Sequence, residues 1–132
     1  MDEEIKKFVD AWIKVSVALS VFSGEPGSDL KPFFWAYESL DNLVRDEPEK
    51  AWPIMLAIRE ATNDYKVLAH LAAGPFEDLI NLHGDKFIDR IENLAKADQE
   101  FAHFIGGIWP DREMPTELLA RLKAIMKKPR WD

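Results

Sequence analysis

The sequence contains no cysteine among its 132 residues, which excludes disulfide bonds, thiolate catalysis and cysteine-based metal sites. It also has no Gly-x-Gly-x-x-Gly or Gly-Lys-Ser/Thr loop and no Gly-x-Ser-x-Gly turn, so the common phosphate-binding loops and the nucleophile elbow of hydrolases are missing. Basic residues are in deficit, with 17 Lys and Arg against 24 Asp and Glu and a net charge of −7. This balance argues against nucleic acid as a partner, because a phosphate backbone attracts the opposite charge.

Long hydrophobic runs are lacking as well. The apolar stretch over residues 5–22 is interrupted by Lys6, Lys7, Asp10 and Lys14, so we do not expect it to span a membrane. The chain begins Met1-Asp2-Glu3-Glu4, which is acidic where a signal peptide needs basic residues. We therefore expect a cytoplasmic protein that does not bind membranes.

What the chain does have is the composition of a soluble globular domain, with 47% hydrophobic and 31% charged residues. A chain of this length buries roughly two-thirds of its unfolded surface, which is enough to fold without a metal ion. Helix signals recur from end to end, and no strand is convincing. We predict an all-α single domain over residues 1–132, a compact orthogonal or helical-repeat-like array of about seven to eight helices.

Glycine, proline and capping residues separate the predicted helices. The first helix belongs to an N-terminal segment, residues 1–22, and a loop over residues 23–29 follows it. A second helix is expected to begin near Lys31, with Pro32 in its first turn. Asp46 and Asp98 are expected to cap helices, and Gly74-Pro75 and Gly84 to break them. Thr116 is expected at the start of the last helix.

A weak internal repeat supports the helical-repeat interpretation. The repeat length is about 36 residues, which lies in the range of repeat lengths found for stacked helical hairpins. A shift of this length aligns Met55 with Ile91, Ile58 with Leu94, Ala61 with Ala97, Tyr65 with Phe101 and Leu68 with Phe104. A coincidence of two amphipathic patterns is the alternative.

A short basic segment, Lys127-Lys128-Pro129-Arg130, lies close to the C-terminus. We expect this segment to be solvated, because cations are favourable at a helix C-terminus. Docking of the segment on an acidic partner is the alternative.

Several segments resemble one protein family. They are residues 34–38, 46–52, 71–80 with His83-Gly84, 87–92 and 101–109, and the most specific reads Gly-Pro-x-Glu-Asp-Leu followed by His-Gly. On these residues the chain resembles an uncharacterised bacterial family of small all-helical domains of unknown function, over residues 33–126. The resemblance implies an all-α bacterial domain, and it implies no activity, cofactor or catalytic residue. The first helix lies outside the pattern.

Two aromatic residues fall outside the apolar stripe of the second helix. Phe34 and Trp35 project among polar side chains, an arrangement typical of interfaces. The predicted binding surface is Phe34, Trp35, Glu38, Asp41 and Asn42. The alternative is that the first helix covers the two aromatic rings, because its end is apolar nearly all round. If the surface is intermolecular, a homodimer is its expected form.

A second polar candidate is formed by Glu77, Asp78 and His83, which could make an acid–base group or a metal site. Helical spacing places His83 on a different face from both acids. We therefore favour roles at helix ends, with Glu77 bonding the free N–H groups of a first turn and His83 favoured by the negative pole of a last turn.

The other histidines carry no metal-ligand spacing, so no metal or cofactor is predicted. His70 is expected beside Lys66 on the outward face of its helix, and His103 opposite Phe101 and Phe104.

These observations leave three functional hypotheses. The first is a non-enzymatic protein-interaction or regulatory module with an unidentified protein partner. The second is an inhibitor or immunity-type protein that binds a basic toxin or nuclease, which the acidic charge favours. The third is a carboxylate-dependent enzyme acting near Glu77 and Asp78.

Overall fold

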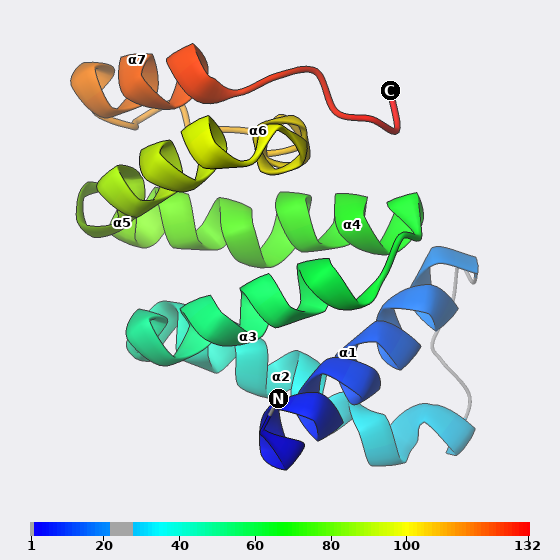
Figure 1. Ribbon diagram of the computed structural model, residues 1–132. Coiled ribbons are helices and arrows are strands. Elements are labelled where there is room, and N and C mark those ends of the chain that lie inside the picture. The colour runs from blue at the N-terminus through cyan, green and yellow to red at the C-terminus, as the bar shows by residue number, and fades with distance from the viewer. Residues whose placement is uncertain (1, 22–27) are drawn as a thin grey trace. The chain divides into compact units, whose positions relative to one another are not determined.

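The computed structural model describes residues 2–21 and 28–132, and every regular element within them is a helix (Figure 1). The all-α prediction is therefore confirmed. The chain divides into two compact units, Met1–Leu71 and Ala72–Asp132, which are described separately below. The single domain over residues 1–132 stays a prediction. The loop expected over residues 23–29 lies mostly outside the described residues.

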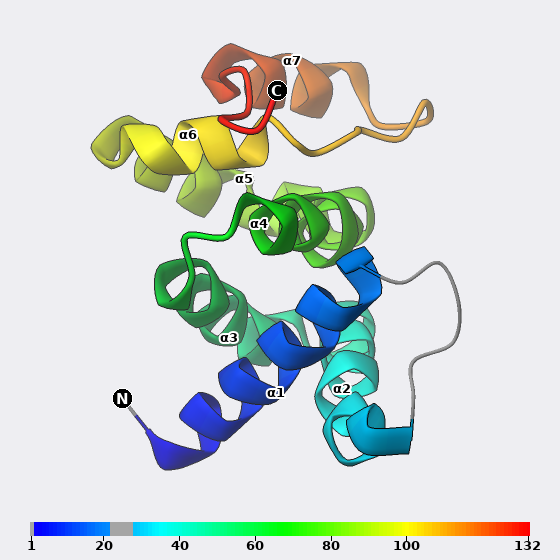
Figure 2. The ribbon, with the colours of Figure 1, turned by 90° about the vertical axis from the view of Figure 1, so that its right-hand side faces the viewer.

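The first unit is built around α1. Its elements are α1 (Glu3–Val21), a 3₁₀ helix η1 (Ser28–Phe33), α2 (Phe34–Asp46), α3 (Pro48–Ala61) and α4 (Tyr65–Leu71). The α1 helix packs against α2, α3 and α4 (Figure 2). Pro32 lies in η1, so the expectation that it opens an α-helix is wrong. The α-helix itself begins at Phe34, after the tighter 3₁₀ turns have carried the proline.

The core of the first unit follows the 3.6-residue period of its helices. Its largest fully buried residues from α1 to α4 are Trp12, Leu40, Met55, Ile58 and Leu71. Asp46 is the last residue of α2, and Glu47 precedes α3 without a side-chain capping bond. The prediction that Asp46 caps a helix is therefore wrong. Pro48 in the first turn of α3 removes one of the N–H groups that a cap would have bonded.

The second unit consists of a π-helical turn η2 (Ala72–Phe76), α5 (Glu77–Ala97), α6 (Gln99–Ile105) and α7 (Thr116–Ile125). The α5 helix packs against both α6 and α7. Phe76, Phe101 and Phe104 form an aromatic cluster with ring centroids 5.1–6.0 Å apart. The Asp98 carboxylate accepts the Phe101 N–H at 3.2 Å, so the predicted cap at this residue is confirmed.

The described helical residues fall into six uninterrupted runs, fewer than the seven to eight helices expected. Two expected breaks, at Gly74-Pro75 and near Gly84, lie inside one run over residues 65–97. A π-helical turn holds Pro75, and its wider hydrogen-bond spacing tolerates a residue that has no N–H. His83 has non-helical φ and ψ of −135° and 22°, so the second break becomes a kink within α5.

The basic C-terminal segment is bonded to α6 through its backbone, and its Lys127, Lys128 and Arg130 side chains are exposed, as expected of a solvated end. The Lys127 N–H donates to the Ala102 carbonyl at 3.0 Å, and the His103 Nδ1–H donates to the Lys128 carbonyl at 2.7 Å. Trp131 packs edge-on against Phe104 with a centroid distance of 6.4 Å. Backbone bonds and one aromatic ring therefore hold the segment, while the lysine side chains stay exposed.

Candidate functional site

Trp35 is the most exposed aromatic residue of the predicted surface. It occupies the second position of α2, and 45% of its surface is exposed. The Phe8 ring of α1 meets it edge-to-face, with centroids 5.2 Å apart and an angle of 72°. Helix α1 therefore covers part of Trp35 and leaves the rest accessible. That the accessible part is a binding surface stays a prediction.

A groove of about 500 Å³ adjoins Trp35 and is lined by Lys7, Asp10, Ala11, Lys14, Pro32, Phe33 and Trp35. The Lys14 ammonium lies 4.4 Å from the centroid of the Phe33 ring, within cation–π range. The groove thus combines aromatic walls with two cations and one carboxylate. We call it the Trp35 groove. Sequence analysis missed its lysines because they come from α1, and only the packing of α1 on the start of α2 brings them beside Trp35.

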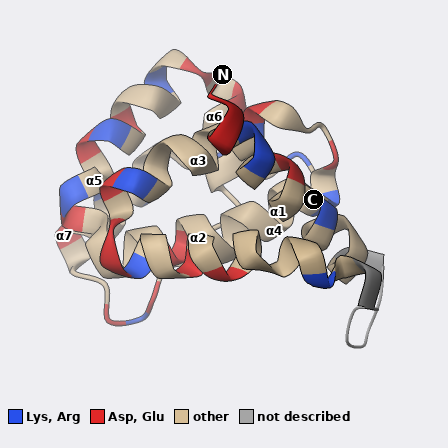
Figure 3. Ribbon diagram, turned by 90° about the horizontal axis from the view of Figure 1, so that it is seen from below, with Lys and Arg blue, Asp and Glu red and all other residues tan. Residues whose placement is uncertain are grey.

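The other members of the predicted surface separate into two sets. Asn42 lines a second groove of about 360 Å³ together with Phe8, and its side-chain oxygen accepts from Arg45 at 2.7 Å. Figure 3 shows acidic residues, in red, on α2. Phe34 is partly buried, and Glu38 and Asp41 are exposed. None of these three lines either groove. The contact between Phe8 and Trp35 joins the two grooves, so the predicted surface extends onto α1.

A polar network lies inside the first unit. Ser16 is fully buried, and its Oγ is 2.9 Å from the Nδ1 of His70. The Tyr37 hydroxyl is 2.6 Å from the Nε2 of the same ring. Trp12 completes the cluster, with its ring centroid 5.9 Å from that of Tyr37 and 5.3 Å from that of His70. His70 is therefore not on an outward face, and that expectation is wrong.

Burial lowers the pKa of His70, and the nearby charge of Asp41 opposes this shift. A neutral imidazole donates from one ring nitrogen and accepts at the other, and hydroxyl groups can satisfy both. Ser16 sits on the buried stripe of α1, where it has no access to solvent. A substrate could not reach the buried Ser16 hydroxyl. The network of Ser16, Tyr37 and His70 is therefore suited to holding α1, α2 and α4 together. In the sequence, the signal for this buried network was Ser16, a polar residue within the apolar stripe of the first helix.

The secondary polar candidate lies at the start of the second unit. Glu77 is partly buried, and its Oε1 accepts the Trp109 N–H at 2.8 Å. Asp78 is exposed, and His83 is partly buried at the kink in α5. Glu77 thus anchors the loop that precedes α7, a role different from the bond to its own first turn that we expected.

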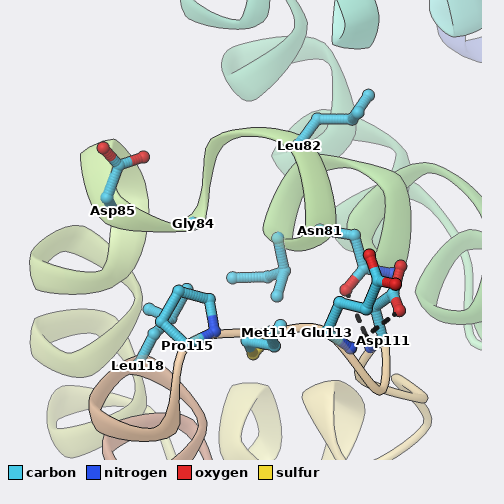
Figure 4. Close-up of a pocket in the computed structure, with 10 residues that line it drawn as sticks. Asn81, Leu82, Gly84, Asp85, Asp111, Glu113, Met114, Pro115 and Leu118 are labelled. Atoms are coloured by element: carbon cyan, nitrogen blue, oxygen red, sulfur yellow. Dashed lines mark hydrogen bonds between the residues drawn. The ribbon is translucent and has the colours of Figure 1, made fainter.

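A groove of about 420 Å³ lies next to these residues, and none of Glu77, Asp78 and His83 lines it (Figure 4). Its lining comes from α5, from the loop after Trp109 and from the start of α7. We call it the α5–α7 groove, and its residues are Ile80, Asn81, Leu82, Gly84, Asp85, Asp111, Glu113, Met114, Pro115 and Leu118. Sequence analysis missed it because its two walls are about thirty residues apart in the chain.

Arg121 fixes α7 beside α5 in this unit. Its guanidinium donates to Asp89 and to Glu92, with the shortest contact to each at 2.5 Å. The hydrogen bond from Arg121 is the main cause of a lowered pKa at Glu92. These ion pairs are exposed or partly exposed, so they orient α7 more than they stabilise the fold.

Within residues 2–21 and 28–132, the acidic and histidine side chains form no group of three or more that could hold a metal ion. No helix in the same ranges has the length and apolar character needed to cross a bilayer.

Comparison with known proteins identifies a family. A family model described as a family of unknown function (DUF6869) covers residues 23–130. The matched region begins after α1, as the resemblance in the sequence implied, and it extends into both units. No curated protein and no solved structure is similar to the chain at a significant level.

Proposed function

Because the chain belongs to DUF6869, a family of unknown function, we propose its function from its own surfaces: a non-enzymatic protein-interaction or regulatory module. The observation that carries this proposal is Trp35, which is 45% exposed and held edge-on by Phe8. An aromatic ring that is already fixed loses little conformational freedom on binding, and tryptophan is enriched among the residues that dominate binding energy. We include in this proposal the bacterial origin and the cytoplasmic location that the sequence predicts.

The residues that line the Trp35 groove determine which kind of partner segment can bind there. Phe33 and Pro32 extend the apolar area around the indole, and Lys7 and Lys14 stand at the α1 side. Interfaces typically combine such an apolar centre with a polar rim. A partner segment with an apolar side chain and a nearby carboxylate fits this pattern.

The inhibitor or immunity-type hypothesis is the second candidate, and the net charge of −7 favours it. A basic toxin or nuclease would be attracted by this charge, mainly through a faster association rate. The carboxylate-enzyme hypothesis has less support, because the Oε1 of Glu77 already accepts a backbone N–H.

Affinity capture from cells of the source organism tests the interaction proposal. The wild-type chain and the Trp35→Ala and Trp109→Ala variants serve as baits, with captured proteins quantified by mass spectrometry. We expect a partner whose binding falls at least about tenfold with Trp35→Ala, the effect of a dominant interface residue. Trp109→Ala is the comparison variant: its indole is 78% exposed in the other unit, so a partner lost with Trp35→Ala and kept with Trp109→Ala depends on the first unit. If no captured protein depends on Trp35, this surface is not the binding site.

A further inference from the structure

The α5–α7 groove in the second unit has a preformed wall. The Trp109 N–H donates to Glu77, and the Asp111 N–H donates to the Asn81 side-chain oxygen at 3.0 Å. Within the loop, the Glu113 N–H donates to Asp111 Oδ1 at 3.1 Å. These bonds attach the loop to α5 at two points. A partner would therefore meet a surface that needs little ordering on binding, which lowers the cost of association.

The floor of the groove is apolar. Ile80 and Met114 are buried there, Leu118 is partly buried, and Pro115 is exposed at one side. Leu82 and Trp109 add apolar surface nearby, with 56% and 78% of their areas exposed. Large exposed apolar side chains beside a concave surface are typical of protein contacts.

Every charged residue that lines the groove is acidic: Asp85, Asp111 and Glu113. Figure 4 shows Asp85 at one side of the cavity and Asp111 with Glu113 at the opposite side, with Met114 between them. Lys86 and Arg112 are adjacent in the chain, but they do not line the groove. The wall therefore offers negative charge at two separated places over an apolar centre.

From this arrangement we propose that the α5–α7 groove docks a basic, partly apolar peptide segment of a protein partner. A lysine or arginine at each end of the segment pairs with the separated carboxylates, and an aliphatic residue between them covers Met114 and Leu118. A single metal ion is a poorer fit, because these carboxylates are not gathered into a metal-binding group within the described chain. The docking site shares no lining residue with the Trp35 groove, and it does not depend on the function proposed for that groove.

A fluorescence-anisotropy titration tests this proposal directly. The probe is a labelled nonapeptide with Lys-Gly-Leu-Gly-Lys at its centre and glycine and serine at both ends, so that in an extended chain both lysines and the leucine point to one face. We expect saturable binding to the wild-type chain that weakens about fivefold or more in the double variant Asp111→Asn/Glu113→Gln, because two exposed ion pairs are lost. Replacing the leucine of the probe with serine should also weaken binding, since the apolar floor then loses its contact.

The matched control is Glu3→Gln/Glu4→Gln, which removes the same number of negative charges from the exposed start of α1 in the first unit. This control and Trp35→Ala should both keep the wild-type affinity for the probe. Circular dichroism establishes that each variant is folded. Equal weakening by the two double variants would show general attraction to an acidic protein and would overturn the proposal. So would an unchanged affinity in Asp111→Asn/Glu113→Gln or no binding to the wild-type chain.

Discussion

At the scale of single residues, the polar cluster of Ser16, Tyr37 and His70 is the feature that most distinguishes the first unit. A buried polar group costs free energy unless it is hydrogen-bonded, and both ring nitrogens of His70 are bonded. The three residues come from α1, α2 and α4, so one imidazole links three helices. Such a network fixes how the helices pack more strictly than an apolar core of equal volume.

The lowered pKa of His70 predicts a pH-dependent stability. The unfolded chain binds the proton more tightly than the folded chain, so stability from this residue is present above the unfolded pKa of 6.5 and is lost as pH falls below it. Chemical denaturation between pH 7.5 and 5 should show the free energy of unfolding falling, by at most about 1.4 kcal/mol per pH unit for one proton. Glu92 and Glu100 also have lowered pKa values, but carboxylates of this kind affect stability at more acidic pH.

His70→Gln is the control for this prediction. Glutamine keeps hydrogen-bonding groups but does not titrate, so the loss of stability between pH 7.5 and 5 should shrink markedly. The variant should also be less stable than wild type at pH 7.5, by about 1–3 kcal/mol, because a bonded buried group is replaced imperfectly. An unchanged pH dependence in His70→Gln would assign the effect to other residues.

At the scale of elements, helix boundaries were predictable where the hydrophobic period and the capping residues agree. They were less predictable where tertiary packing determines whether a helix breaks or continues. The first helix and the cap at Asp98 follow directly from local sequence. The turn at Gly74-Pro75 does not, because both residues favour a break and only the surrounding core makes a π-helical turn preferable. His70 was misplaced for the same reason: its partners lie 54 and 33 residues away in the chain. Trp35 was predictable as a residue outside the core stripe, whereas the groove beside it required α1.

The contact between α6 and the C-terminal segment makes Gly106 a sensitive position. A Cβ atom at Gly106 would overlap the backbone oxygen of Lys127, and a backbone atom cannot move aside as a side chain can. We expect Gly106→Ala to lower the free energy of unfolding by about 1–3 kcal/mol, a cost typical of overpacking. Thermal or urea denaturation measures the change.

Gly84→Ala is the matched control in the same unit. Its Cβ would lie 2.7 Å from the Cδ2 of Leu118, the end of a flexible side chain that can shift, and alanine also favours the helix by up to about 1 kcal/mol. Its effect should be smaller than that of Gly106→Ala. In a chain that ends at Met126, Gly106→Ala should lose its penalty. A penalty that persists after this truncation would mean that the overlap with Lys127 is not its cause.

At the scale of the whole molecule, the charge distribution bears on association with other chains. The net charge of −7 disfavours close approach of two copies unless their contact surfaces are locally complementary. The Trp35 groove carries Lys7 and Lys14, and α2 beside it carries the exposed acids Glu38 and Asp41. In a two-fold interface each copy presents the same patch to the other, so the lysines of one copy can face the acids of its partner.

This complementarity predicts a homodimer through the surface around Trp35. Sedimentation equilibrium at micromolar concentration should show dimerisation of the wild-type chain and at least about tenfold weaker association for Trp35→Ala, because the indole lies at the centre of the contact. Lys14→Glu should also weaken the dimer, since it places like charges opposite each other. Lys66→Ala, which changes an exposed residue of α4, should leave it intact. A wild-type chain that stays monomeric, or a dimer that survives Trp35→Ala, would leave Trp35 available only to a different protein.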